Sequence, residues 1–122
     1  MNDVLILGSS KGLGKSLYKF FDTDGVKVLG VSRTEGDYTD LICDLNNKDQ
    51  TNKLVETLYS SEIMPKSIIF NAGQGSSKKE TLEERKKELM DQNFHNSKNF
   101  IEILEKYHNK LDGFKNLIFI NS

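Results

Sequence analysis

The sequence predicts an α/β protein with a doubly wound parallel sheet. Five short apolar runs alternate along the chain with segments whose apolar residues recur at helical spacing. Runs that are apolar at every position are typical of parallel strands buried on both faces, so helices are expected on both sides of the sheet. The chain has 122 residues, of which 36% are hydrophobic, which fits one domain with its own core. The expected strands are Val4 to Leu7, Val26 to Val31, Leu41 to Cys43, Ser67 to Phe70 and Leu117 to Ile120.

The first strand runs directly into a glycine-rich turn and then into a helix. Gly8, Gly12 and Gly14 are spaced so that the chain reverses tightly and its backbone N–H groups can approach a phosphate. The same glycines let the new helix pack close against its strand, and Leu17 and Phe21 give that helix an apolar face. This segment is therefore predicted to bind a phosphate-bearing ligand.

Two other interpretations of the turn stay open. The P-loop pattern G-x-x-x-x-G-K-[ST] matches at Gly14, Lys15 and Ser16, but Ser9 stands where its first glycine should be. Asp44, at the end of the third expected strand, could serve as the acid of a second nucleotide-hydrolase motif. The remaining alternative is a glycine-rich turn that binds no ligand.

Right-handed crossovers and a topological switch beside the first strand give the expected strand order 3-2-1-4-5. The fourth crossover is a long polar stretch, in which residues 80–90 have the composition of a solvated helical face. Beyond it the pattern predicts two apolar stripes, one of Phe94, Ile101 and Leu104 and a second of Phe100, Ile103 and Tyr107. A single contact with a sheet would bury only one of these stripes, so a partner helix is expected to cover the other.

Composition excludes several classes of partner. No apolar run approaches the length of a membrane span, and no signal-peptide pattern precedes the first strand, so a soluble cytoplasmic protein is expected. A net charge of −1 gives no argument for nucleic acid or membrane binding. Cys43 is the single cysteine and is predicted to be a buried thiol, and no metal site is expected because His95 and His108 lack companion ligands. A small-molecule ligand is therefore favoured.

Three motifs in this order resemble the short-chain dehydrogenase/reductase family. They are Gly8-x-x-x-Gly12-x-Gly14 after the first strand, Asp44-Leu45 after the third and Asn71-Ala72-Gly73 after the fourth. Leu7 departs from the pattern, since many members carry threonine before the first glycine. The resemblance covers the whole chain and implies a three-layer Rossmann-type domain over residues 1–122, with strand order 3-2-1-4-5 and truncated after the fifth strand.

The resemblance also implies a set of nicotinamide-cofactor contacts. Asp44 is expected to accept a hydrogen bond from the adenine amino group, with a strand-ending turn as the alternative role. An NAD enzyme places an acid at the end of the second strand, but Ser32 and Arg33 stand there, and Lys11 adds a second cation, so NADP(H) is preferred over NAD(H). Glu35 would oppose this if its side chain turned inward. The expected cofactor-binding residues are Gly8, Ser9, Ser10, Lys11, Gly12, Leu13, Gly14, Ser32, Arg33, Asp44, Leu45, Asn71, Ala72 and Gly73.

Only half of the family's catalytic set is present. Asn93 matches the family's asparagine and Ser122 its serine, but no Tyr-x-x-x-Lys occurs in the 122 residues. The expected function is therefore that of the cofactor-binding front of an NADP-dependent oxidoreductase that acts on a small carbonyl or alcohol, inactive as this chain alone. The alternatives are a noncatalytic NADP-binding regulatory module and a P-loop phosphotransferase. An apolar fifth strand at the sheet edge and the two-striped helix favour a homo-oligomer.

Overall fold

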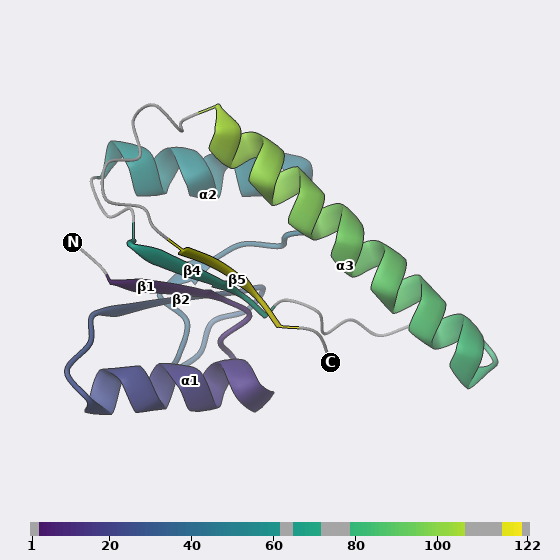
Figure 1. The fold of residues 1–122 in the computed structure, drawn as a ribbon, viewed down its shortest axis with the longest axis horizontal. Coiled ribbons are helices and arrows are strands. Elements are labelled where there is room, and N and C mark those ends of the chain that lie inside the picture. Colours follow the sequence, from purple (N-terminus) through teal and green to yellow (C-terminus); the bar gives the residue numbers. More distant parts are fainter. Residues whose placement is uncertain (1–2, 62–64, 72–78, 107–115, 121–122) are drawn as a thin grey trace.

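The computed structural model describes residues 3–61, 65–71, 79–106 and 116–120. These residues form three layers, with one helix on one face of a parallel sheet and two helices on the other (Figure 1). The elements in chain order are β1 (Val4–Leu7), α1 (Gly12–Thr23), β2 (Val28–Ser32), β3 (Leu41–Ile42), α2 (Lys48–Ser60), β4 (Ser67–Phe70), α3 (Leu82–Glu105) and β5 (Asn116–Phe119). The predicted parallel α/β fold is confirmed.

The sheet has the order β3-β2-β1-β4-β5, with all pairs parallel. Val4 of β1 pairs with Val28 of β2 on one side and with Ser67 of β4 on the other. β1 thus lies between β2 and β4. The helices that follow β1 and β4 in the sequence cover opposite faces of the sheet, α1 one face and α3 the other (Figure 1). Such a switch point opens a crevice at the carboxyl ends of the strands.

The connection between β2 and β3 differs from the expected alternation of strands and helices. Residues 33–40 form a loop without a helix, because eight residues are too few for a helical crossover. Asp40 fastens the end of this loop: its N–H donates to the Gly30 carbonyl at 2.8 Å, and its carboxylate accepts from the Gly30 N–H at 2.8 Å and the Tyr18 hydroxyl at 3.0 Å. Burial, followed by the bond to Asp40, raises the pKa of Tyr18 to about 12.

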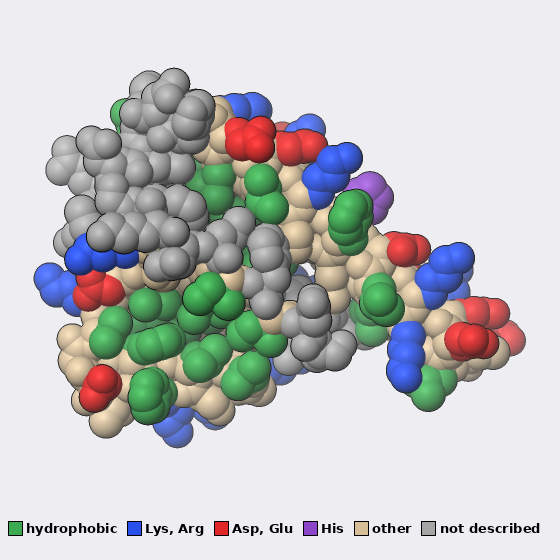
Figure 2. Space-filling model, viewed as in Figure 1, with side chains coloured by type: hydrophobic (Ala, Val, Ile, Leu, Met, Phe, Trp, Pro, Cys, Tyr) green, Lys and Arg blue, Asp and Glu red, His purple; other side chains and the backbone are tan. Residues whose placement is uncertain are grey.

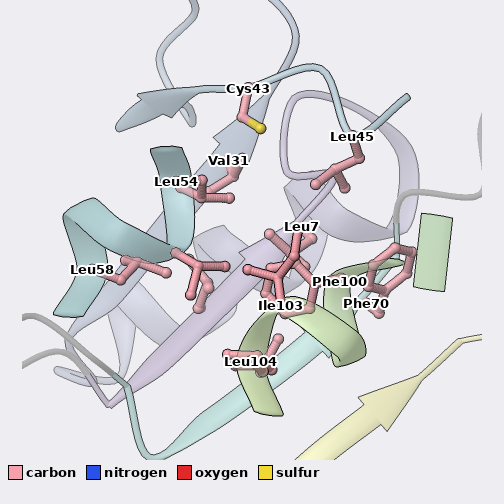
Figure 3. Packing of buried hydrophobic residues seen from close by; sticks show 13 residues of the cluster. Leu7, Val31, Cys43, Leu45, Leu54, Leu58, Phe70, Phe100, Ile103 and Leu104 are labelled. Atoms are coloured by element: carbon pink, nitrogen blue, oxygen red, sulfur yellow. The ribbon is translucent and has the colours of Figure 1, made fainter. Parts of the chain in front are cut away.

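The larger part of the core lies between the sheet and the α2–α3 layer (Figure 3). Leu7, Leu58 and Phe100 are fully buried there, and the rings of Phe70 and Phe100 meet edge to face with centroids 6.0 Å apart. A smaller cluster lies on the α1 face, where Ile6 is fully buried. Burying these apolar side chains is the main contribution to the stability of the fold.

The apolar stripes of α3 are arranged differently from the expectation. Phe100, Ile103 and Leu104 are buried together, whereas Phe94 is 68% exposed. Residues at spacings of three and four share one helix face, so Leu104 joins Phe100 and not Phe94. The predicted grouping was wrong in this respect, and Tyr107 lies outside the described residues.

The glycine turn brings α1 very close to β1. Gly8 and Gly12 have positive φ angles of 98° and 60°, which glycine adopts without strain. Gly14 is buried in the first turn of α1, and a Cβ atom there would overlap the carbonyl oxygen of Gly8 and the side chain of Asn71. The predicted close packing of helix and strand is confirmed.

Replacing Gly14 with alanine is therefore expected to destabilise the protein by about 1 to 3 kcal/mol, because the added methyl group has no space. Helix propensity alone would predict the opposite sign, since alanine is favoured over glycine by about 1 kcal/mol inside a helix. Urea unfolding measures the difference. Gly36→Ala is the matched control: its Cβ would lie 3.9 Å from its nearest neighbour, so a change within about 0.5 kcal/mol is expected. A Gly14→Ala protein as stable as the parent would contradict the packing argument.

Candidate functional site

A cleft opens at the carboxyl ends of the strands, where β1, β2, β3 and β4 meet the side of α3. The space that water molecules could occupy inside it is about 80 Å³, less than the range of about 300 to 1,000 Å³ that is usual for small-molecule sites, so the cleft is small and partly open. Most of the residues that line it have polar side chains, although apolar atoms make up the larger part of the wall surface. The lining residues are Gly8, Ser10, Lys11, Val31, Ser32, Arg33, Cys43, Asp44, Leu45, Asn46, Asn71, Gln92, Asn93 and Asn96.

The glycine turn forms one end of the cleft. Its N–H groups at Gly8 and Ser9 donate to the Val31 carbonyl at 2.8 and 3.2 Å, which ties the turn to β2. The Ser9 side chain is fully buried and donates to the Tyr38 carbonyl at 2.5 Å. Ser10 and Lys11 line the cleft. Ser9 therefore supports the turn instead of facing the cleft.

Three of the predicted turn residues, Gly12, Leu13 and Gly14, do not line the cleft and contribute only to the shape of the turn. Gly12 begins α1, and Leu13, which is 49% exposed, is not among the residues that line the cleft. Gly14 lies beneath the turn against Gly8, as described above. These positions hold the backbone of the turn and of the first helical turn in place.

The amino end of α1 is open to a ligand. Of the three helices that the structure describes, α2 and α3 are capped by the side chains of Asn47 and Thr81, which accept from Gln50 N–H and Glu84 N–H. Lys11 at the start of α1 makes no such cap, and the first turn of α1 holds no acidic residue. Uncapped N–H groups and the positive end of the helix dipole favour an anion.

Ser32 and Arg33 form the wall beside the turn. The Ser32 hydroxyl lies 2.7 Å from the Thr34 carbonyl and 2.6 Å from the Thr39 hydroxyl. A carbonyl can only accept, so Ser32 donates to Thr34 and accepts from Thr39, and its proton is used within the loop. Arg33 is exposed at the cleft, while Glu35 is not among the lining residues.

Asp44 and Leu45 follow β3 and face the cleft from the next strand. One carboxylate oxygen of Asp44 accepts from the Asn46 N–H at 3.0 Å, and the Asp44 N–H donates to the side chain of Gln50 at 2.8 Å. Asp44 therefore has the turn-forming role that the sequence left as an alternative, and its carboxylate also lines the cleft. Leu45 is buried and belongs to both the core and the cleft wall.

Asn71 connects β4 to the glycine turn. Its N–H donates to the Leu7 carbonyl at 2.8 Å, and its side-chain amide donates to the Gly8 carbonyl at 3.2 Å. The residue is buried and lines the cleft. Ala72 and Gly73, the rest of this predicted motif, lie outside the described residues.

One of the two predicted catalytic residues reaches the cleft. Asn93 lines it from α3, and its carbonyl accepts from the Ser97 hydroxyl at 2.9 Å. Ser122 lies outside the described residues.

Sequence reasoning missed three carboxamide side chains of the same wall, those of Asn46, Gln92 and Asn96. The Asn96 amide donates to the side-chain oxygen of Asn46 at 2.8 Å and so links α3 to the loop after β3. Asn96 lies one helical turn after Asn93, and Asn46 directly follows the Asp44-Leu45 motif. Helical spacing could have placed Asn96 on the same side of α3 as Asn93, but nothing in the neighbouring sequence indicates its contact with Asn46.

The thiol of Cys43 is part of the wall but is not set up for chemistry. Burial raises its pKa to about 11, so it stays protonated at neutral pH. The described part of the chain contains no group of three histidine, cysteine or acidic residues that could hold a metal ion. No described helix is both long and apolar enough to cross a membrane.

Comparison with known proteins gives matches among solved structures. A short-chain dehydrogenase/reductase from Saccharomyces cerevisiae is 25% identical, with a TM-score of 0.72, and the match covers 100% of this chain and 54% of the yeast chain. A short-chain dehydrogenase from Leptospira borgpetersenii with bound NAD+ is 18% identical at a TM-score of 0.68, covering 90% of this chain and 48% of the other. A 4-hydroxyisoleucine dehydrogenase complexed with NADH is 17% identical at a TM-score of 0.70, covering 99% and 56%.

No family model and no curated protein matches the sequence. The chain spans about half the length of the solved structures that it matches. The predicted resemblance is confirmed in three dimensions: the chain has the fold of about half of a short-chain dehydrogenase/reductase.

Proposed function

We propose that the chain binds NADP(H) in this cleft as the cofactor-binding part of a short-chain oxidoreductase. The observation that carries the proposal is the uncapped amino end of α1, whose N-cap residue Lys11 lines the same cleft as Arg33. Two of the similar structures carry NAD+ and NADH, so their cofactors belong to the nicotinamide class.

The residues present fit such a cofactor. Gly8 of the glycine turn lines the cleft without a side chain, and the uncapped N–H groups at the start of α1 suit a pyrophosphate. Asp44, on the neighbouring strand end, has a carboxylate that can accept from the adenine amino group. The cofactor would supply hydride transfer to or from a small carbonyl or alcohol substrate.

The charges that line the cleft favour NADP(H) over NAD(H). Lys11 and Arg33 both line the cleft, and the end of β2 holds Ser32 in place of a carboxylate that would repel a 2′-phosphate. Because the Ser32 proton is used within the loop, the two cations carry the proposal. Charge-assisted hydrogen bonds from cations to phosphate are the strong class of such contacts.

NADPH is therefore expected to bind more tightly than NADH, and Arg33→Ala is expected to weaken NADPH binding about tenfold or more while changing NADH little. One charge-assisted contact contributes roughly 1.5 to 3 kcal/mol, which sets this magnitude. Titration calorimetry with both cofactors measures it.

Lys19→Ala, which removes an exposed lysine of α1 outside the cleft, is the control and should change neither affinity. Equal affinities of the parent protein for NADPH and NADH would contradict the cofactor assignment. Tight binding of Mg-ATP with neither dinucleotide bound would favour the P-loop interpretation.

The 122 residues place only part of a reductase's chemistry at the cleft. Asn93 can position a polar group or a water, but a neutral amide is no proton donor for the alkoxide that forms when a carbonyl is reduced. The sequence contains no Tyr-x-x-x-Lys pair to supply that proton. A noncatalytic NADP-binding module is accordingly the second candidate function, and the cytoplasm is the proposed location of either.

The chain alone is not expected to oxidise NADPH at an appreciable rate with any carbonyl substrate. Losing a positioned general acid typically costs about 10² to 10⁴ in rate, and losing substrate orientation lowers it further. Spectrophotometric assay of NADPH oxidation against a panel of aldehydes and ketones tests this. Turnover that disappears when Tyr18 or Tyr59 is replaced by phenylalanine would show that the catalytic group had been assigned wrongly.

We also propose that the chain forms a homo-oligomer. β5 is the last strand of the sheet, where Ile118 is 46% exposed, and α3 has apolar side chains that the described residues leave uncovered. Exposed apolar edges and faces of this kind favour association with another chain. Light scattering that gave the monomer mass across a wide concentration range would contradict the proposal.

A further inference from the structure

The loop that carries Arg33 is held at its far end by a side chain of α1. Residues 33–40 join β2 to β3, and Arg33, at the start of the loop, lines the cleft. Asp40, at the other end, accepts from the Tyr18 hydroxyl at 3.0 Å and from the Gly30 N–H at 2.8 Å through the same carboxylate oxygen. One oxygen atom thus joins α1, β2 and the loop.

α1 gives this contact a firm support. Tyr18 packs against the smaller apolar cluster, which contains the fully buried Ile6 of β1. In the space-filling view, apolar side chains gather where α1 lies along the sheet (Figure 2). The Tyr18 ring also meets the Tyr38 ring edge to face, with centroids 5.6 Å apart, so one side chain contacts the loop at two places. Tyr18 therefore fastens the loop to a packed helix.

Hydrogen bonds across the loop connect this anchor to Arg33. Thr39, which precedes Asp40, donates its hydroxyl proton to the Ser32 hydroxyl at 2.6 Å. The Ser32 hydroxyl donates in turn to the Thr34 carbonyl at 2.7 Å. Ser32 and Thr34 are the two chain neighbours of Arg33. The two ends of the loop are therefore tied together on either side of Arg33.

The Arg33 side chain depends on this backbone for its position. It is exposed, and it forms no hydrogen bond or ion pair with another residue that the structure describes. A long side chain of this kind has many rotamers, so ordering it on a ligand costs entropy. A backbone that is already held beside the cleft lowers the cost of binding, and the planar guanidinium needs a defined geometry to bond a phosphate.

We propose that Tyr18 and Asp40 are positioning residues for the choice of NADP(H): they hold the loop so that Arg33 meets the 2′-phosphate of the cofactor. The inference rests on the proposed function, in which Arg33 contacts that phosphate. Neither Tyr18 nor Asp40 lines the cleft, so their effect passes through the loop. NADH lacks the 2′-phosphate and gains nothing from the anchor.

The experiment compares two substitutions of Asp40 by titration calorimetry with NADPH and NADH. Asp40→Ala removes the oxygen that joins Tyr18 to Gly30, and it is expected to lower the preference for NADPH over NADH about threefold or more. Asp40→Asn removes the same negative charge but keeps a side-chain oxygen that can accept both hydrogen bonds, so most of the preference should remain. Equal effects of the two substitutions would mean that charge acts and not position, and would overturn the proposal.

A second variant tests the other half of the contact. Tyr18→Phe removes the hydroxyl but keeps the ring beside Tyr38, and the bond from the Gly30 N–H to Asp40 is unaffected. The preference for NADPH is therefore expected to fall by less than in Asp40→Ala, about twofold. If Asp40→Ala does not fold, Tyr18→Phe still measures the link between α1 and the loop.

Combination with Arg33→Ala tests whether Asp40 acts through Arg33. Once the guanidinium is gone its position no longer matters, so adding Asp40→Ala to Arg33→Ala should change the preference by less than about twofold. The same loss in both backgrounds would mean that Asp40 acts on NADPH independently of Arg33, which contradicts a positioning role.

Controls separate the anchor from general damage. Asp37→Ala is matched to Asp40→Ala: Asp37 is exposed on the same loop and forms no hydrogen bond with another described residue, so the preference should not change. Unchanged NADH affinity shows that a variant has kept its fold and its cleft. A parent that binds both cofactors equally would overturn the proposed cofactor choice and this inference together. A parent whose preference is lost in Arg33→Ala but kept in Asp40→Ala and Tyr18→Phe would overturn this inference alone.

Discussion

The close approach of α1 to β1 at Gly14 is the constraint on which the site depends. The Gly8 carbonyl lies where a side chain at Gly14 would stand, and the same carbonyl accepts the side-chain amide of Asn71 from β4. One backbone group thus joins the ends of two strands and the start of a helix. This junction is built from backbone groups and the Asn71 side chain, and Lys11, in the same turn, lines the cleft beside it.

The parts of the fold that could be predicted from the sequence are those encoded by neighbouring residues. The continuous apolar run of β1 and the glycines after it are local signals, and each led to the observed element. The loop between β2 and β3 was beyond such reasoning. Its shape depends on the Ser9 hydroxyl reaching the Tyr38 carbonyl, 29 positions away, and on a glycine at position 30, where any Cβ would overlap that carbonyl.

The same distinction explains the results for α3 and for the cleft. The periodicity of α3 predicted a helix with too much apolar surface, but only packing against β4 decides that Phe100 is inside and Phe94 outside. Asn93 was predicted because it belongs to a motif. Asn96 was not, because its contact is with Asn46, 50 positions away, and no single segment of the sequence records that contact.

Ser32 connects the shape of the loop to the proposed choice of cofactor. Its hydroxyl donates to the Thr34 carbonyl, and Arg33, which lies between these two residues, lines the cleft. An ionised carboxylate at this position has no proton to donate, so it would leave the Thr34 carbonyl without this donor as well as repel a 2′-phosphate. A small neutral hydroxyl at position 32 therefore has two effects: it adds no negative charge beside Arg33, and it holds the loop that presents this cation to the cleft.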